Sequence, residues 1–217
     1  NQITASIDQD PSVILNLARL KRKDDYTYLH SVSVCALMIN LGRRMHLDEQ
    51  MVRECGMAGL LHDVGKLAIP NEILLKPSRL DENEFQIVRD HPLAGYKILA
   101  AADGISDAAL DVCLHHHEKM DGTGYPHALS GEDLGLMTRM AAICDVYDAV
   151  TSQRSYNRPW SASDALAKMQ SWEGHFDKLI LQSFVGSLGI LPRGTLVRLS
   201  NNHLAVVTSE SRADYFL

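Results

Sequence analysis

Helical spacing of apolar residues runs through most of this sequence, and no alternating run typical of a strand precedes residue 194. Leu29, Val32, Ala36 and Ile39, for example, recur at intervals of three and four residues. The sequence therefore predicts an all-α fold, a helical bundle with a small β-hairpin near its C-terminus. Helices are expected over residues 12–21, 25–44, 48–65, 82–90, 92–101, 106–118, 137–151, 161–172 and 177–188.

Two segments depart from the helical pattern. Residues 119–136 contain four glycines and a proline, which predicts a long ordered loop, and loops of this length are often functional. Residues 195–208 are rich in β-formers, and Asn201-Asn202 in their middle is typical of a hairpin turn. We therefore expect a lead-in helix within residues 1–24, a helical domain over 25–190 and a hairpin extension over 191–217.

Composition excludes several classes of protein. The 217 residues carry a net charge of −6, which argues against a protein that coats DNA or RNA. No apolar stretch is long enough to predict a membrane span. The four cysteines are widely spaced without a CxxC pair, so we expect buried, reduced thiols, as in a cytoplasmic protein. Because no initiator Met is present, we expect the chain to begin inside a longer protein with an upstream regulatory domain.

Histidine is unusually frequent, with 10 among the 217 residues, and several histidines fall in tight groups. His62-Asp63 lies where a helix is expected to end, so the imidazole could bind one metal ion and the carboxylate could bridge two. His115–His117 directly precede the glycine-rich loop, and a helix would spread them so that at most two face one site. The alternatives are a structural helix end for the first group and a solvent-exposed cluster for the second.

Buried carboxylates and two isolated histidines add to this set. Asp145 and Asp148 lie one turn apart in an apolar helix, where a carboxylate is costly unless it is paired or metal-bound. A buried salt bridge is the alternative for them, and hydrogen-bonded structural histidines are the alternative for His30 and His91. Taken together, these nitrogen and oxygen donors suit iron or manganese, or less selectively zinc, rather than a thiolate zinc site.

Four groups of residues together resemble the HD-GYP family, a branch of the HD-domain metal-dependent phosphohydrolases. They are His62-Asp63 with Lys66, His116-His117-Glu118, Asp121-Gly122-Thr123-Gly124-Tyr125-Pro126 and Asp145-Val146-Tyr147-Asp148-Ala149. Members of this family hydrolyse the bacterial second messenger cyclic di-GMP. The resemblance covers about residues 25–190 and implies that they form an HD-GYP catalytic domain.

The resemblance also implies a binuclear metal site. The implied metal ligands are His30, His62, Asp63, His91, His116, His117 and Asp145. Asp63 would bridge the two ions and, with Lys66, would be a catalytic residue. Lys66 and Arg154 would contact the phosphates of the substrate, with Arg158 and Tyr125 as further substrate-binding candidates.

Two positions depart from the family pattern. Some members bind a third metal ion through a Glu one turn before the first histidine ligand, but this chain has Tyr26 there. We therefore predict two ions, although Asp25 lies close in sequence. The family often has a basic residue three positions after the residue that corresponds to Arg154, whereas this chain has Asn157 followed by Arg158.

The implied reaction is hydrolysis of one 3′-5′ phosphodiester bond of cyclic di-GMP to linear pGpG, with a second cleavage to GMP left open. Two divalent ions can activate water and neutralise charge on a phosphate. Iron or manganese is expected, with zinc, nickel or magnesium as alternatives. The competing functions are a cyclic di-GMP receptor without turnover and another HD-type nucleotide phosphohydrolase. We further expect a bacterial cytoplasmic location, a dimer, and contact with a GGDEF-type cyclic di-GMP synthase through the GYP loop.

Overall fold

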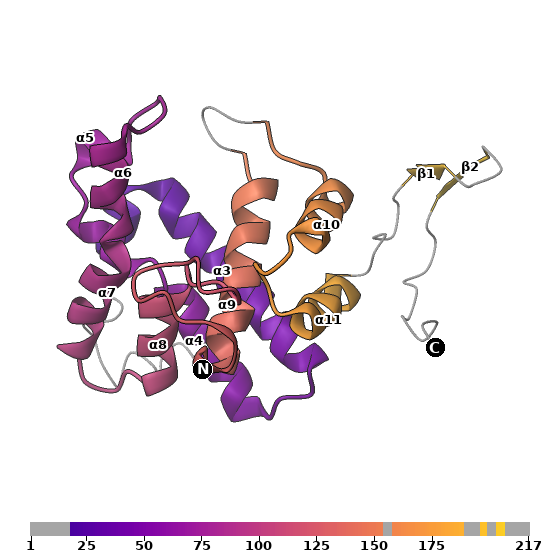
Figure 1. Ribbon diagram of the computed structural model, residues 1–217, viewed down its shortest axis with the longest axis horizontal. Coiled ribbons are helices and arrows are strands. Elements are labelled where there is room, and N and C mark those ends of the chain that lie inside the picture. The colour runs from indigo at the N-terminus through magenta and orange to yellow at the C-terminus, as the bar shows by residue number, and fades with distance from the viewer. Residues whose placement is uncertain (1–17, 154–157, 189–195, 199–202, 207–217) are drawn as a thin grey trace.

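The computed structural model describes residues 18–153, 158–188, 196–198 and 203–206, and its elements are labelled in Figure 1. Residues 18–23 are helical, and the earlier part of the predicted first helix lies outside the described residues. The helices that follow are α3 (Asp25–Arg44), α4 (Glu49–Leu61), η1 (Val64–Ala68), α5 (Asn71–Leu74), α6 (Glu82–Arg89), α7 (His91–Ala100), α8 (Asp107–His115), η2 (Gly131–Asp133), α9 (Leu136–Thr151), α10 (Ala162–Ser171) and α11 (Lys178–Leu188). The predicted all-α fold is confirmed.

Capping side chains determine where several helices begin. At the start of α3, the Asp24 carboxylate accepts hydrogen bonds from the backbone N–H groups of Tyr26 and Thr27. Asp81 and Glu84 form a reciprocal capping box at the start of α6. These contacts satisfy N–H groups that have no partner within their own helix, so the sequence itself specifies these helix starts.

The core is centred on α3, which packs against α4, α9 and α11. Val34 and Met38 on its inner face are fully buried and join Met140 of α9 in the main hydrophobic cluster. Figure 1 shows α10 and α11 on one side of α3 and α9, and α5 to α8 on the other. This packing holds α3 and α9 together and so brings His30 and Asp145, which they carry, to the same place in the fold.

A two-stranded hairpin follows the helices. β1 (Leu196–Arg198) pairs antiparallel with β2 (Leu204–Val206), with Val197 opposite Ala205. These strands confirm the predicted hairpin, whereas its predicted turn at Asn201-Asn202 lies outside the described residues. Figure 1 shows the two strands to one side of the helical bundle. None of the helices in the described ranges combines the length and the apolar character that crossing a bilayer requires.

Two helices end earlier than the sequence pattern predicts. The helix expected over residues 48–65 stops at Leu61, and the chain continues as η1 from Val64. The helix expected over residues 106–118 stops at His115. In both places the helix ends just before polar residues, His62-Asp63 and His116-His117, that face neighbouring elements. The spacing of apolar residues gives no signal of such an end. The single turn of α5 was not predicted.

Candidate metal centre

Asp63 lies at the centre of a buried cluster of histidines. His62 follows α4 and Asp63 precedes η1, so the two residues occupy the junction between these helices. Only 1% of the surface of each residue is exposed. The two carboxylate oxygens of Asp63 face different groups of histidines, and this divides the cluster into two halves.

The first half contains His30, His62 and Asp145, and we call it the carboxylate half. His62 Nε2 lies 3.3 Å and His30 Nε2 lies 3.7 Å from Asp63 Oδ2. Asp145 Oδ1 lies 2.9 Å from His30 Nε2 and 3.9 Å from His62 Nε2. The donor atoms of His30, His62 and Asp63 are therefore close enough to one another to hold one metal ion.

The second half contains His91, His116 and His117, and we call it the imidazole half. His91 Nε2 lies 3.2 Å and His116 Nε2 lies 3.8 Å from Asp63 Oδ1. The three histidines are close enough together to hold a second ion. His117 also faces the carboxylate half, because its Nδ1 lies 3.8 Å from Asp145 Oδ2.

Hydrogen bonds on the outer side of the rings aim these histidines at Asp63. The Nδ1–H groups of His62, His91 and His116 donate to the backbone carbonyls of Gly59, Val88 and Val112, respectively. His30 differs, because its Nδ1 lies 2.6 Å from the carboxylate of Asp148. A ring that donates through Nδ1 keeps Nε2 available as a metal ligand, so both arrangements preorganise the cluster for metal.

Two buried atoms at the centre have no hydrogen-bond partner among the described residues, His62 Nε2 and Asp63 Oδ1. An unpaired buried polar group costs about 1–3 kcal/mol, so a partner from outside the chain is favoured. A divalent metal ion accepts electron pairs from both a neutral imidazole nitrogen and a carboxylate oxygen. The donor set therefore fits metal ions.

The two halves differ in charge. Burial disfavours a charged His30, but hydrogen bonds to Asp145 and Asp148 outweigh burial and raise its pKa to about 9. Burial lowers the pKa of His117 to about 3, and burial together with neighbouring histidines lowers that of His116 well below its usual value. Without metal, the carboxylate half thus holds a protonated histidine, whereas these two rings of the imidazole half are neutral.

A close approach of two backbone segments fixes the Asp63 junction against α7. A Cβ at Gly65 would lie 1.9 Å from the carbonyl oxygen of His91 and 2.5 Å from the backbone nitrogen of Gly95. No side chain fits at that distance, so residue 65 must be glycine for Asp63 and His91 to lie this close. The sequence marks Gly65 only as a helix stop.

Lys66 reaches the cluster. Its Nζ lies 2.5 Å from Asp63 Oδ2. Although burial opposes ionisation of Asp63, the Lys66 ammonium holds the pKa of that carboxyl well below its usual range. Of the other predicted phosphate contacts, Arg158 is exposed and pairs with none of the cluster residues described here, and Arg154 lies outside the described residues.

The glycine-rich loop places Tyr125 on the imidazole half. The rings of Tyr125 and His117 are stacked with their centres 4.8 Å apart. The loop folds back this closely because Gly124 has no side chain: a Cβ there would lie 2.4 Å from Glu118 Cα. The Arg89 guanidinium lies 4.5 Å from the centre of the Tyr125 ring. Arg89 was not identified in the sequence, because only the tertiary structure brings the end of α6 to this loop.

Three residues near predicted ligands in the sequence do not contribute a ligand atom to either half of the cluster. His115, which lies outside the family motif, has its Nε2 at 3.0 Å from a ring nitrogen of His127. Tyr26, at the position of the third-metal Glu in some family members, stacks parallel to the ring of His30 with centres 6.2 Å apart. Asp25 is exposed. The structure therefore brings seven predicted ligands together without these three residues.

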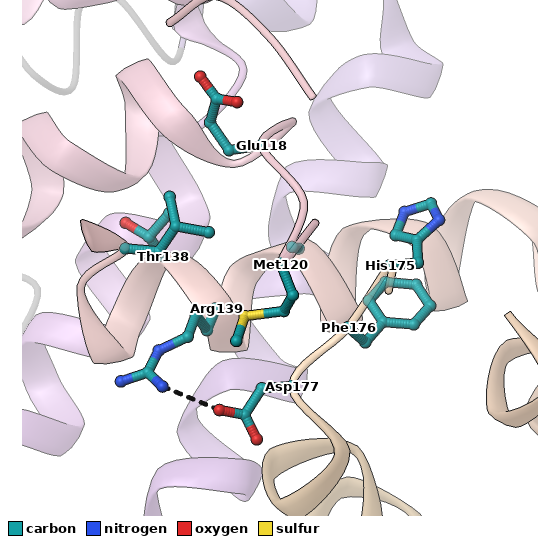
Figure 2. A pocket seen from close by; sticks show the side chains of 9 residues that line it. Glu118, Met120, Thr138, Arg139, His175, Phe176 and Asp177 are labelled. Carbon is teal, nitrogen blue, oxygen red and sulfur yellow. Dashed lines mark hydrogen bonds and ion pairs between the residues drawn. The ribbon is translucent and has the colours of Figure 1, made fainter. Parts of the chain in front are cut away.

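A small pocket lies apart from this cluster, and its lining includes Glu118, Arg139, His175 and Asp177 (Figure 2). Arg139 Nη1 pairs with Asp177 Oδ2 at 2.8 Å. Figure 2 shows the Glu118 carboxylate directed away from that pair, and its Oε1 accepts a hydrogen bond from the backbone N–H of His127. Because no residue of either half lines this pocket, we assign it no catalytic role.

A model of the HD domain family matches residues 9–180, and the chain belongs to that family. The chain is 50% identical over 210 residues to cyclic di-GMP phosphodiesterase PA4108 of Pseudomonas aeruginosa. This alignment covers 97% of the chain and 51% of PA4108. The chain is also 39% identical over 166 residues to the cyclic di-GMP phosphodiesterase response regulator RpfG of Xanthomonas campestris, covering 73% of this chain and 43% of RpfG. The chain spans about half the length of these curated relatives. The HD-GYP resemblance drawn from the four motifs is confirmed.

The fold is also similar to that of a solved structure. Bd1817, an HDG"Y"P protein from Bdellovibrio bacteriovorus, aligns with a TM-score of 0.60 and 18% sequence identity, covering 71% of this chain and 50% of Bd1817. At this level of identity, the comparison supports the HD-type helical fold alone.

Proposed function

We propose that this chain is a metal-dependent phosphodiesterase that hydrolyses one 3′-5′ phosphodiester bond of cyclic di-GMP to give linear pGpG. The observation that carries the proposal is the placement of two histidine groups on opposite oxygens of Asp63, with the Lys66 ammonium beside them. The relatives PA4108 and RpfG are cyclic di-GMP phosphodiesterases, which supports cyclic di-GMP as the substrate. Residues 25–190 would form the catalytic domain.

Each half of the centre would hold one divalent ion, and Asp63 would be shared. The proposed ligands are His30, His62 and Asp145 in the carboxylate half, and His91, His116 and His117 in the imidazole half. When bound, such a pair of ions supplies an activated water and positive charge for the phosphoryl oxygens. Iron or manganese suits these donors, and zinc, nickel and magnesium are the alternatives to test.

The position of Lys66 gives the chain's own contribution to the reaction. The Lys66 side chain is 20% exposed, whereas that of Asp63 is 1% exposed, so the ammonium lies toward the solvent side of the centre. From there Lys66 can donate a hydrogen bond to a non-bridging phosphate oxygen and stabilise the charge that develops on it. Arg154 and Arg158 follow α9 in the sequence and are proposed as further phosphate contacts, and Tyr125 is proposed as a further substrate-binding residue.

A turnover assay tests this proposal. The full chain is loaded with Fe(II) or Mn(II), incubated with cyclic di-GMP, and the products are separated by liquid chromatography. We expect pGpG to accumulate first, with GMP as a later product if pGpG binds again. Cyclic GMP-AMP and cyclic di-AMP are run in parallel, because faster hydrolysis of either would favour another HD-type phosphohydrolase. Binding of cyclic di-GMP to the metal-loaded chain without any product would instead establish a receptor.

A further inference from the structure

An apolar stripe runs along the solvent face of α3. Leu29 is 62% exposed and Val32 is 41% exposed, Ala36 is exposed and Ile39 is half-buried. Their spacing keeps all four side chains on one face of the helix. The apolar repeat that predicts this helix therefore belongs largely to its outer face.

The inner face of α3 packs into the core through residues other than those of the stripe. Val34, Met38 and Leu41 are fully buried in the main core, and Ser31 beside them is also buried. Single exposed apolar residues are ordinary on protein surfaces, whereas a contiguous apolar row marks a contact surface. The stripe on the other side of the helix is therefore available for an intermolecular contact.

Opposite charges flank the stripe, one at each end. Asp25 precedes Leu29 by four residues and Arg43 follows Ile39 by four residues, so both fall on the line of the stripe. Both side chains are exposed, and neither has an ion-pair partner among the described residues. Positions 25, 29, 32, 36, 39 and 43 thus follow the alternating four- and three-residue spacing of a coiled-coil seam.

We propose that a second copy of this chain covers the stripe, through antiparallel pairing of the two α3 helices about a two-fold axis at the level of Val34. This symmetry places Leu29 opposite Ile39, Val32 opposite Ala36, and Asp25 opposite Arg43. The larger Val32 then meets the smaller Ala36 on both sides of the axis. An ion pair closes each end of the interface.

The order of the charges favours a second copy over an unrelated partner. A two-fold interface requires a surface that is complementary to itself, with each residue and its counterpart equally far from the axis. Asp25 and Arg43 meet that requirement in the antiparallel arrangement, whereas parallel helices would bring like charges together. One pair of helices makes a small interface, so we expect a dimer that depends on protein concentration.

Sedimentation velocity of the full chain, from low micromolar to several hundred micromolar, tests the proposal. We expect a monomer–dimer equilibrium for the wild-type chain. Val32→Glu should weaken dimerisation at least tenfold, because it buries a charge beside the axis in both copies. Leu179→Glu is the matched control, since Leu179 is 76% exposed on α11 and should leave the dimer unchanged.

A charge exchange tests the antiparallel arrangement itself. Asp25→Lys and Arg43→Glu should each weaken the dimer, and the double variant should restore it, because the ion pairs re-form with reversed signs. Circular dichroism and thermal melting confirm that each variant is folded. A wild-type chain that stays monomeric at every concentration, a dimer that Val32→Glu leaves intact, or a double variant no better than the single ones would overturn the proposal.

Discussion

The two halves of the candidate metal centre share Asp63 but surround it with different donors. The carboxylate half adds Asp145, whose Oδ1 lies 2.9 Å from His30 Nε2. The imidazole half adds three histidines, and a carboxylate oxygen approaches it most closely at 3.2 Å, between Asp63 Oδ1 and His91 Nε2. Since a cation is held best by donors that carry negative charge, the imidazole half depends on Asp63 more than the carboxylate half does.

The halves also differ in how their rings are held. His91 and His116 donate to the backbone carbonyls of Val88 in α6 and Val112 in α8, which no side-chain substitution can remove. His30 depends on one side chain, Asp148, on a different helix. His62 of the carboxylate half is also held by a backbone carbonyl, that of Gly59, so the difference lies in His30. The imidazole half is thus poor in charge, whereas the carboxylate half is rich in charge but, through His30, open to a single change outside the ligands.

The largest expected effect comes from removing what the halves share. Asp63→Ala should lower turnover of cyclic di-GMP by about 10³-fold or more, beyond the loss of a single electrostatic contact. We expect the imidazole half to lose its ion first, because Asp63 supplies its nearest carboxylate. Elemental analysis of the purified variant, together with the turnover assay, measures both effects.

Asp103→Ala is the control for this substitution, since Asp103 is an exposed carboxylate outside the cluster. It should leave metal content and turnover unchanged. Two ions per chain retained in Asp63→Ala would contradict the role of Asp63 as a shared ligand.

The next largest effect distinguishes the catalytic role of the positive charge on Lys66 from metal binding by the ligands. Lys66→Ala should keep the metal content of the wild-type chain while kcat falls by about 10²–10³-fold, the loss associated with one transition-state contact. Lys97→Ala, an exposed lysine on α7, is the control. Loss of metal in Lys66→Ala would instead show that the ammonium supports the cluster through its contact with Asp63.

The third effect should be confined to the carboxylate half. Asp148→Asn keeps the size of the side chain but removes the charge that faces His30 Nδ1, and such partners of a ligand are worth about 10–100-fold in metal affinity. We expect one ion to become easier to remove while the other is unaffected. Stepwise competition with a chelator, followed by elemental analysis, resolves the two ions.

The chain offers a matched control for that change. Asp111 faces His115 Nδ1 at 2.7 Å, much as Asp148 faces His30 Nδ1 at 2.6 Å, but His115 lies outside both halves. Asp111→Asn should therefore leave both ions as tightly bound as in the wild-type chain. Equal weakening of both ions by Asp148→Asn would show that the halves are not independent.

How much of this site the sequence predicts depends on which residues are considered. His62 and Asp63 are adjacent in a motif, so local sequence identifies them, and the helical spacing of α3 and α9 places His30 and Asp145 on known elements. The sequence does not show which oxygen of Asp63 faces which histidines, because that depends on where α4 ends. It also does not reveal the contact between Gly65 and the His91 carbonyl, since nothing local signals that two backbone segments will meet.

The sequence also predicts only part of the arrangement of the three histidines before the loop. A continuous helix through residues 106–118 would allow at most two of the three histidines to face one site. Two of them, His116 and His117, do face the cluster, but the helix ends at His115. His116 and His117 therefore reach the cluster from a turn, and not from one helical face. Predicting this would require knowing that the loop folds back over Glu118.

The smallest expected effect concerns the loop contact that only the imidazole half has. Tyr125 stacks on His117, and Arg89 lies 4.5 Å from the centre of the tyrosine ring. A cation–π contact at a partly exposed site is worth about 0.5–1 kcal/mol, so Arg89→Met should lower kcat/KM by about 2–5-fold. Metal content should not change, because Arg89 contacts the loop and not a ligand atom.

Arg89→Lys decides what that contact does. Lysine keeps the positive charge near the ring, so it should recover part of the activity that Arg89→Met loses, whereas a purely steric role would leave both variants equally impaired. Tyr125→Leu should make the substitution at Arg89 neutral, because the ring through which Arg89 acts is gone. Additive losses in the double variant would mean that Arg89 acts on the substrate directly, and the loop would then contribute no more to the imidazole half than packing.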